Sequence, residues 1–126
     1  MLSLDGDTAP YLQYAYARIR SIFRRTGTDG PPDAPVHLVA AAERALAFEL
    51  VGFAAVVNAV EQSLAFHQLA GYLHRLATTF SGFYEQCPVL RADAAVRDSR
   101  LVLCDLTARV LRQGLHLLGI RTPERM

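Results

Sequence analysis

Lysine and tryptophan are absent from this chain of 126 residues, and cysteine occurs only twice. Without lysine the chain has neither a phosphate-loop Lys nor a Schiff-base Lys, so we do not expect it to carry out ATP chemistry. Cys87 and Cys104 lack the CxxC spacing of metal or redox sites, so we interpret them as ordinary core thiols. The longest apolar stretch, residues 50–57, is interrupted by Gly52 and is too short to cross a bilayer. The first ten residues do not resemble a signal peptide, and we expect a cytoplasmic protein.

Apolar residues make up 52% of the chain and charged residues 20%, which is typical of one folded domain at this length. The net charge is only +1, but its distribution is uneven. Residues 11–25 carry four arginines and no acid, and residues 91–126 carry seven arginines against four acids. Both ends are therefore basic, which suits one basic face on a small bundle.

Apolar residues recur at helical spacing along most of the chain. A first helix opens at GDTAP, with Thr8 as N-cap and Pro10 in the first turn, and stops at Gly27. Further helices are predicted at about 37–51, 54–64, 67–86 and 92–118, and Gly119 ends the last one. The core of the second is predicted at Leu38, Ala42, Leu46 and Leu50, and that of the fourth at Leu69, Leu73, Leu76, Phe80, Phe83 and Cys87. No sustained strand pattern occurs, so the predicted fold class is all-α, a bundle of about five helices.

The first helix carries two bands of side chains. At about 100° per residue, the core stripe contains Leu12, Ala15, Ile19, Ile22 and Phe23. Beside it lies a second band of Tyr11, Tyr14, Arg18 and Arg25. Nucleic-acid bases stack on tyrosine rings and phosphates pair with arginine, so this band is a candidate platform for single-stranded RNA. Periodicity alone favours the plainer interpretation, in which the tyrosines widen the buried face and the arginines meet water.

Three long segments decide between these interpretations. Residues 6–24, GDTAPYLQYAYARIRSIFR, resemble the GDTGPYLQYAHARIRSI segment of arginyl-tRNA synthetases, in their C-terminal helical anticodon-binding domain. The segments YLHRLATTFSGFYEQCPVL at 72–90 and RLVLCDLTARVLRQGLHLLGIRTPERM at 100–126 resemble later motifs of the same family, in the same order. The resemblance covers nearly the whole chain. It implies the DALR anticodon-binding fold, with residues 1–126 as a single helical domain truncated at its N-terminal side.

The resemblance also implies a ligand and a site. The ligand is the anticodon loop of tRNA-Arg, including its central cytosine. The family positions that shape the binding surface correspond here to Tyr11, Tyr14, Arg18, Tyr84 and Met126. Gln13 lies in the same motif, but its helix phase turns it away from the stripe. ATP and arginine would belong to a catalytic domain absent from this chain, so we expect no catalysis and no cofactor here, and neither a membrane nor DNA as a partner.

Three positions depart from the family pattern. Ala9 replaces a common glycine, Tyr16 replaces the usual histidine, and Phe66 replaces the proline before His67. None of them falls on the five site positions. Tyr16 lies at the edge of the core stripe, and Phe66 changes how the fourth helix begins.

Two other functional classes remain as alternatives. A freestanding paralogue could use the bundle for protein partners or self-association, through apolar surface left exposed by the missing segments. An enzyme is the weakest reading, because His67 and His74 share a helix face with no acid or cysteine to complete a metal set. Glu43, Glu49, Glu61 and Glu85 are spread over three helices, and we interpret them as solvated charges.

Overall fold

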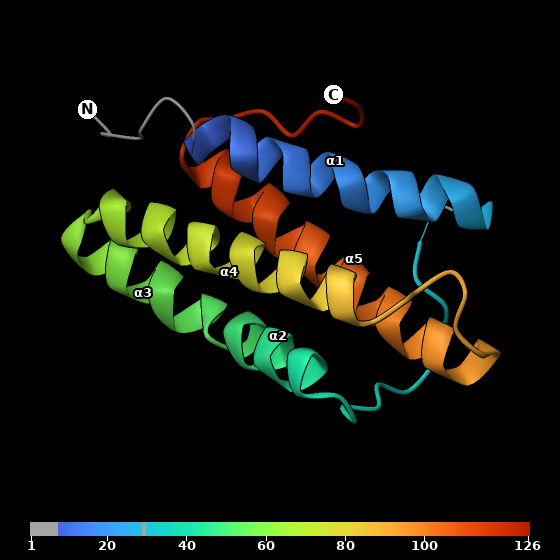
Figure 1. The fold of residues 1–126 in the computed structure, drawn as a ribbon. Coiled ribbons are helices and arrows are strands. Elements are labelled where there is room, and N and C mark those ends of the chain that lie inside the picture. Colours follow the sequence, from blue (N-terminus) through green and yellow to red (C-terminus); the bar gives the residue numbers. More distant parts are fainter. Residues whose placement is uncertain (1–7, 29) are drawn as a thin grey trace.

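The computed structural model describes residues 8–28 and 30–126, and all regular structure in these ranges is helical. The central helix is α4, which contacts each of the other helices (Figure 1). Beyond α5 the chain turns back, so that the C-terminus lies beside α1 (Figure 1). The all-α class predicted from the sequence is confirmed. The helices are α1 (Thr8–Thr26), α2 (Ala41–Val51), α3 (Phe53–Ser63), α4 (Phe66–Gln86) and α5 (Ala94–Leu117).

The predicted count of about five helices is slightly too high. In the described ranges α2 and α3 form one nearly continuous helical rod, which leaves four rods in the bundle. Only Gly52 separates α2 from α3, and the two follow one line beneath α4 (Figure 1). At the break, the Tyr72 hydroxyl donates a 2.6 Å hydrogen bond to the Glu49 carbonyl, which also accepts from the Gly52 N–H at 3.2 Å. Burial, together with the nearby Glu49 carboxylate, raises the pKa of Tyr72 to about 12. The sequence break at Gly52 therefore bends one rod instead of separating two.

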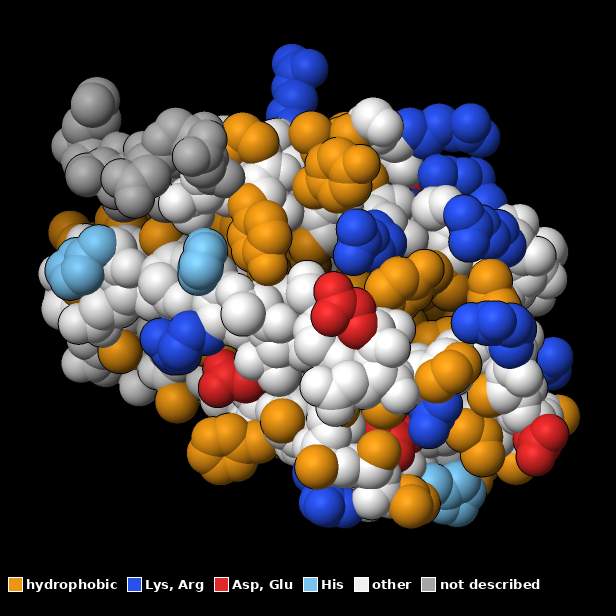
Figure 2. All heavy atoms as spheres, viewed as in Figure 1, with side chains coloured by type: hydrophobic (Ala, Val, Ile, Leu, Met, Phe, Trp, Pro, Cys, Tyr) orange, Lys and Arg blue, Asp and Glu red, His pale blue; other side chains and the backbone are white. Residues whose placement is uncertain are grey.

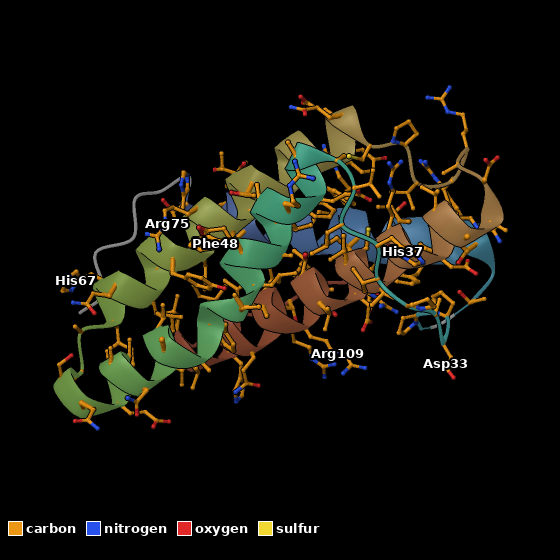
Figure 3. The ribbon with its side chains drawn as sticks, turned by 90° about the horizontal axis from the view of Figure 1, so that it is seen from below. Asp33, His37, Phe48, His67, Arg75 and Arg109 are labelled. Carbon is orange, nitrogen blue, oxygen red and sulfur yellow. The ribbon has the colours of Figure 1, made fainter. Side chains whose placement is uncertain are left out.

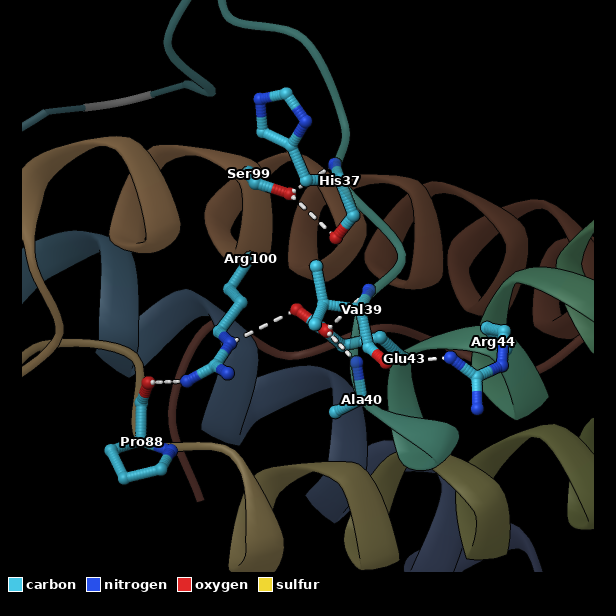
Figure 4. A network of polar contacts seen from close by, with 8 residues as sticks. All are labelled: His37, Val39, Ala40, Glu43, Arg44, Pro88, Ser99 and Arg100. Atoms are coloured by element: carbon cyan, nitrogen blue, oxygen red, sulfur yellow. Dashed lines mark hydrogen bonds and ion pairs between the residues drawn. The ribbon is translucent and has the colours of Figure 1, made fainter.

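The predicted start of the second helix at residue 37 is wrong, because residues 37–40 are not helical. The Glu43 carboxylate accepts hydrogen bonds from the N–H groups of Val39 and Ala40, at 3.1 and 2.7 Å, which caps α2 at Ala41 (Figure 4). The His37 N–H donates to Ser99 Oγ of α5 at 2.8 Å. This segment is thus tied to α5, and Leu38 is exposed instead of joining the core.

The interpretation of Glu43 as a solvated charge is wrong, because its side chain is buried. It is only 2% exposed, and its carboxylate accepts a 3.1 Å bond from Arg100 Nε (Figure 4). Arg100 in turn donates to the Pro88 carbonyl at 2.6 Å. This chain of contacts joins α2, the loop after α4, and α5, so Glu43 is a structural residue at the junction of three segments.

The remaining helix ends lie within two residues of their predicted positions. Gly27 and Gly119 adopt φ of 77° and 76°, the left-handed conformation that glycine accepts without strain. The Gly119 N–H donates to the His116 carbonyl, and the Ile120 N–H donates to the Leu115 carbonyl. These two hydrogen bonds form a Schellman motif at the end of α5. Helix α1 begins at Thr8, and residues 6 and 7 of its predicted opening lie outside the described residues. With Phe66 in place of proline, α4 begins one residue earlier than predicted.

The core forms along the predicted stripes of α1 and α4. All five predicted core residues of α1 and all six of α4 are buried, and Tyr16 joins them at 5% exposure. Cys87 and Cys104 are free buried thiols, as the sequence predicted. Burial raises the pKa of both, to about 12 for Cys104. Neither thiol is therefore a reactive thiolate at neutral pH.

The rod of α2 and α3 is more apolar than the sequence interpretation allowed. By length and composition alone, Ala41–Ser63 would suffice to cross a membrane, and only 11% of its most apolar window is buried. Its outward side chains include Phe48 and Val51, which are 75% and 77% exposed (Figure 3). In the structure this rod packs against α4, where Tyr72 bonds the Glu49 carbonyl, and it is joined to α5 by the Glu43–Arg100 contact.

Candidate functional site

Four of the five site residues predicted from the sequence lie around one cleft. The cleft has a volume of about 410 Å³ and is formed by α1, the C-terminal half of α4 and the end of the chain. Tyr14 and Arg18 come from α1, Tyr84 from α4 and Met126 from the C-terminus. The remaining lining residues are Ala17, Ser21, Ile22, Arg24, Arg25 and Arg125. Segments more than a hundred residues apart in the chain therefore meet at this cleft.

Helix phase explains which α1 side chains reach the cleft. Tyr14, Ser21 and Arg25 are seven and four residues apart, and Arg18 lies one turn beyond Tyr14, so all four occupy one side of the helix. Leu12 and Ile19 on the adjacent side are fully buried and hold α1 against the bundle. The core stripe thus fixes the rotation of α1, and that rotation presents the second band to solvent.

Tyr84 is held from both sides. Its ring stacks on Phe80, with centroids 6.2 Å apart, and the Arg18 guanidinium lies 5.3 Å from its centroid. Phe80 is fully buried, so Tyr84 rests on the core while its outer face meets Arg18. In contrast, the Tyr14 ring is 56% exposed. The cleft therefore offers one open aromatic ring and one aromatic–arginine pair.

Tyr11 does not line this cleft. Its ring packs against His74 of α4, with centroids 5.3 Å apart, and its hydroxyl lies 3.5 Å from Ser81 Oγ. It is 37% exposed and belongs to the same face of α1, nearer the start of the helix. Tyr11 can extend the surface beyond the cleft, but the structure does not bring it together with the other four residues.

A second cleft, of about 350 Å³, adjoins the first. The two share Ile22, Arg25 and Tyr84, and the second continues to the loop that follows α4. That loop contributes Pro88, Val89, Leu90 and Arg91. The joined surface therefore continues from α1 to the loop after α4, with apolar and cationic side chains along it.

The joined clefts are strongly cationic. Arg18, Arg24, Arg25 and Arg125 line the first and Arg91 the second, and no carboxylate side chain is among the described residues that line either. Figure 2 shows arginine side chains gathered over the C-terminal half of α1, beside exposed apolar side chains. Aromatic rings among several guanidinium groups suit a polyanion that also has flat groups to stack.

A larger basic recess, of about 1020 Å³, lies between α5 and the tail. Arg112, His116 and Arg121 line it, together with Arg109, which is paired with Asp105 at 2.9 Å and projects away from α5 (Figure 3). It contains no tyrosine and none of the residues predicted from the sequence. Of these two surfaces, only the Tyr14 cleft has tyrosine rings among its lining residues.

Within residues 8–28 and 30–126, no three His, Cys, Asp or Glu side chains approach closely enough to hold a metal ion. His74 packs on Tyr11, and the acids with described partners form ion pairs with arginine or capping bonds. The residues that line the cleft offer aromatic rings for stacking and positive charge for an anion.

Sequence reasoning missed part of this surface. Arg125 and Arg91 were not singled out, because one lies in the tail and the other in a loop, where periodicity gives no orientation. Their basic character next to the PERM and CPVL segments was the available signal. Arg24 lies at the edge of the cleft and also donates a 3.1 Å bond to the Glu124 carbonyl.

Known proteins match this chain along nearly its whole length. The model of the DALR anticodon binding domain matches residues 12–126. The arginine–tRNA ligase of Streptomyces avermitilis is 53% identical over all of this chain, and that of Haemophilus ducreyi is 50% identical. The chain covers 22% and 23% of these two relatives, so it spans about a fifth of their length.

Solved structures give the same result. The arginyl-tRNA synthetase of Thermus thermophilus superposes with a TM-score of 0.86 at 40% identity, over 98% of this chain and 22% of that one. The arginyl-tRNA synthetase of Plasmodium falciparum superposes with a TM-score of 0.79 at 31% identity, over 99% of this chain and 22% of that one.

Proposed function

The chain belongs to the DALR anticodon-binding domain family, in the form carried by arginyl-tRNA synthetases, and we propose that it binds the anticodon loop of tRNA-Arg in the Tyr14 cleft. The observation that carries this proposal is the convergence of Tyr14, Arg18, Tyr84 and Met126, from three distant segments, on one cationic cleft. Residues 1–126 act as one binding domain, which leaves arginine–tRNA ligation, with ATP and arginine, to a catalytic domain of a longer protein in the cytoplasm.

The chemistry of the cleft supports an RNA loop as the ligand. Loop bases are unstacked from their neighbours, so their faces are free to stack on the open Tyr14 ring and on the outer side of the Arg18–Tyr84 pair, at about 1–3 kcal/mol per base. Arg25, Arg91 and Arg125 are spaced along the joined clefts, where they can pair with successive phosphates. Met126 contributes an apolar contact that is 62% exposed in the free protein. Tyr11 extends the stacking surface beyond the cleft.

The test replaces the two residues of the aromatic–arginine pair. Tyr84→Leu and Arg18→Met should weaken binding to a tRNA-Arg anticodon stem-loop by about 1–3 kcal/mol, or about five- to 150-fold, because each removes a stacking surface. Helical circular dichroism and the melting temperature should change little. The matched control is Arg75→Met, since Arg75 also lies over a tyrosine, 5.8 Å from the Tyr72 centroid, but outside the cleft.

Two outcomes count against the proposal. If Tyr84→Leu and Arg18→Met bind as tightly as the unmodified chain, the cleft is not the RNA surface. If both variants lose their helical signal, these residues serve the core, and the plainer interpretation of the α1 band holds.

The second candidate is a protein-interaction or self-association module. Its supporting observation is the exposed apolar side of α2 and α3, including Phe48 and Val51. Salt separates the two functions, because RNA binding weakens steeply as counterions compete whereas an apolar contact does not. A complex that persists at 0.5 M salt would favour this candidate.

A further inference from the structure

The C-terminal tail is fastened along α1 by contacts that sequence spacing does not reveal. After the turn at Gly119, the Gln13 side-chain amide donates a 2.9 Å hydrogen bond to the Arg121 carbonyl. Arg20 Nε lies 3.1 Å from Glu124 Oε2, and an Arg24 nitrogen donates to the Glu124 carbonyl at 3.1 Å. The tail thus runs along α1 with bonds at two points (Figure 1).

The contacts of Gln13 and Arg20 lie on a different side of α1 from Tyr14 and Arg18, whereas Arg24 also lines the cleft. Gln13, Arg20 and Arg24 are separated by seven and four residues, which places them in one narrow band of the helix. Tyr14 and Arg18 lie roughly 100–140° around the helix from Gln13, at 100° per residue. Arg125 and Met126 follow Glu124 directly, and both line the cleft. Glu124 is therefore held immediately before the two tail residues that reach the site.

We propose that Gln13 and Arg20 are positioning residues, which hold the tail through Arg121 and Glu124 so that Arg125 and Met126 complete the RNA cleft. The RNA part of this inference rests on the proposed function. In this inference the Arg20 guanidinium pairs with Glu124 and not with an RNA phosphate, although Arg20 belongs to the most basic stretch of the chain. It also gives a task to Gln13, which points away from the α1 stripe.

Glu124 distinguishes this inference from plain electrostatics. It is the single acid among residues 119–126 and stands beside a cationic cleft. On charge alone, Glu124→Gln should strengthen binding to RNA, because it removes a negative charge near the polyanion. If Glu124 holds the tail, the same substitution should weaken binding, since Arg125 and Met126 leave their places. The matched control is Glu85→Gln, which removes an exposed acid next to Tyr84 without touching the tail.

The first readout needs no RNA. The rate at which a broad-specificity carboxypeptidase releases Met126 measures how firmly the tail is held. We expect Glu124→Gln and Gln13→Ala each to raise this rate about two- to fivefold, the range expected for one exposed ion pair or hydrogen bond. Glu85→Gln should leave the rate unchanged. Equal rates in all four proteins would overturn the inference, whether or not the chain binds RNA.

The second readout is affinity for a tRNA-Arg anticodon stem-loop at several salt concentrations. We expect about two- to fivefold weaker binding for Glu124→Gln, and equal or slightly tighter binding for Glu85→Gln. Arg20→Met should weaken binding about as much as Glu124→Gln, because both changes release the tail, whereas Arg25→Met should lower the salt slope by about 0.7, one phosphate contact, without releasing Met126. Tighter binding by Glu124→Gln, or undiminished binding by Arg20→Met, would overturn the positioning role. If the unmodified chain binds no RNA, the proposed function fails. The protease rates still decide whether the contacts of Gln13 and Arg20 hold the tail.

Discussion

Glu43 is a buried carboxylate whose charge is balanced by donors from two directions. Burial by itself would raise the pKa of Glu43, but the Ala40 and Val39 N–H groups and the Arg100 guanidinium outweigh it and hold the pKa below its ordinary value of 4.5. The partners are three, four and 57 residues away in the chain. Spacing could predict the local capping bonds but not the contact with Arg100. For that reason the sequence interpretation of Glu43 as solvated was wrong.

The lowered pKa of Glu43 predicts acid sensitivity. The unfolded chain takes up this proton near pH 4.5 and the folded chain only at lower pH, so the stabilisation is complete above that value and is lost as pH falls through the folded pKa. We expect Glu43→Gln to lower the free energy of unfolding by about 1–3 kcal/mol at pH 7, because it leaves the partly buried Arg100 guanidinium without its charged partner. The difference should shrink below pH 4. Denaturant unfolding from pH 2.5 to 7 measures it, with Glu61→Gln, on the exposed side of α3, as the control. Parallel curves for Glu43→Gln and the unmodified chain would contradict the prediction.

At the scale of helices, α4 and α5 approach closely because α5 has no side chain at Gly114. A Cβ built there would lie 2.6 and 2.7 Å from the two terminal carbons of Leu73, which is fully buried, so its side chain would have to shift within the packed core. The apolar spacing of α4 predicted that Leu73 is buried, since that pattern is local. Which residue of α5 faces it depends on the crossing of the two helices, and periodicity within one helix does not contain that information.

A pair of glycine substitutions tests this crossing. Gly114→Ala should destabilise the protein by about 1–3 kcal/mol through overpacking against Leu73, although alanine normally favours a helix. Gly71→Ala is the matched control, because Gly71 is also inside a helix but has open space around it. We expect it to stabilise the protein by about 0.5–1 kcal/mol. Thermal unfolding measures both, and a stabilising Gly114→Ala would show that the two helices are not so closely packed.

At the scale of the whole molecule, the site is assembled from segments that helix spacing alone could not connect. The phase of α1 placed the band of Tyr14 and Arg18 beside the buried stripe but favoured tyrosines that widen the buried face, whereas the Tyr14 ring is 56% exposed. Tyr84 and Met126 were added by resemblance to a family, because no periodicity relates them to α1. Arg91, Arg125 and the bond from Gln13 to residue 121 appeared only with the tertiary structure. Local order was therefore predictable, whereas contacts across the chain were not.

The proposal that this cleft binds the anticodon loop is tested most directly by titrating the unmodified chain with two RNAs at several salt concentrations. One is the tRNA-Arg anticodon stem-loop, and the other is the same stem-loop with its central cytosine replaced. We expect binding of the first with a slope of about −2 to −3 in log affinity against log salt, from three or four phosphate contacts. The second should bind at least about fivefold more weakly, or about 1 kcal/mol. Equal affinity for both RNAs, or affinity that does not change with salt, would contradict the proposal.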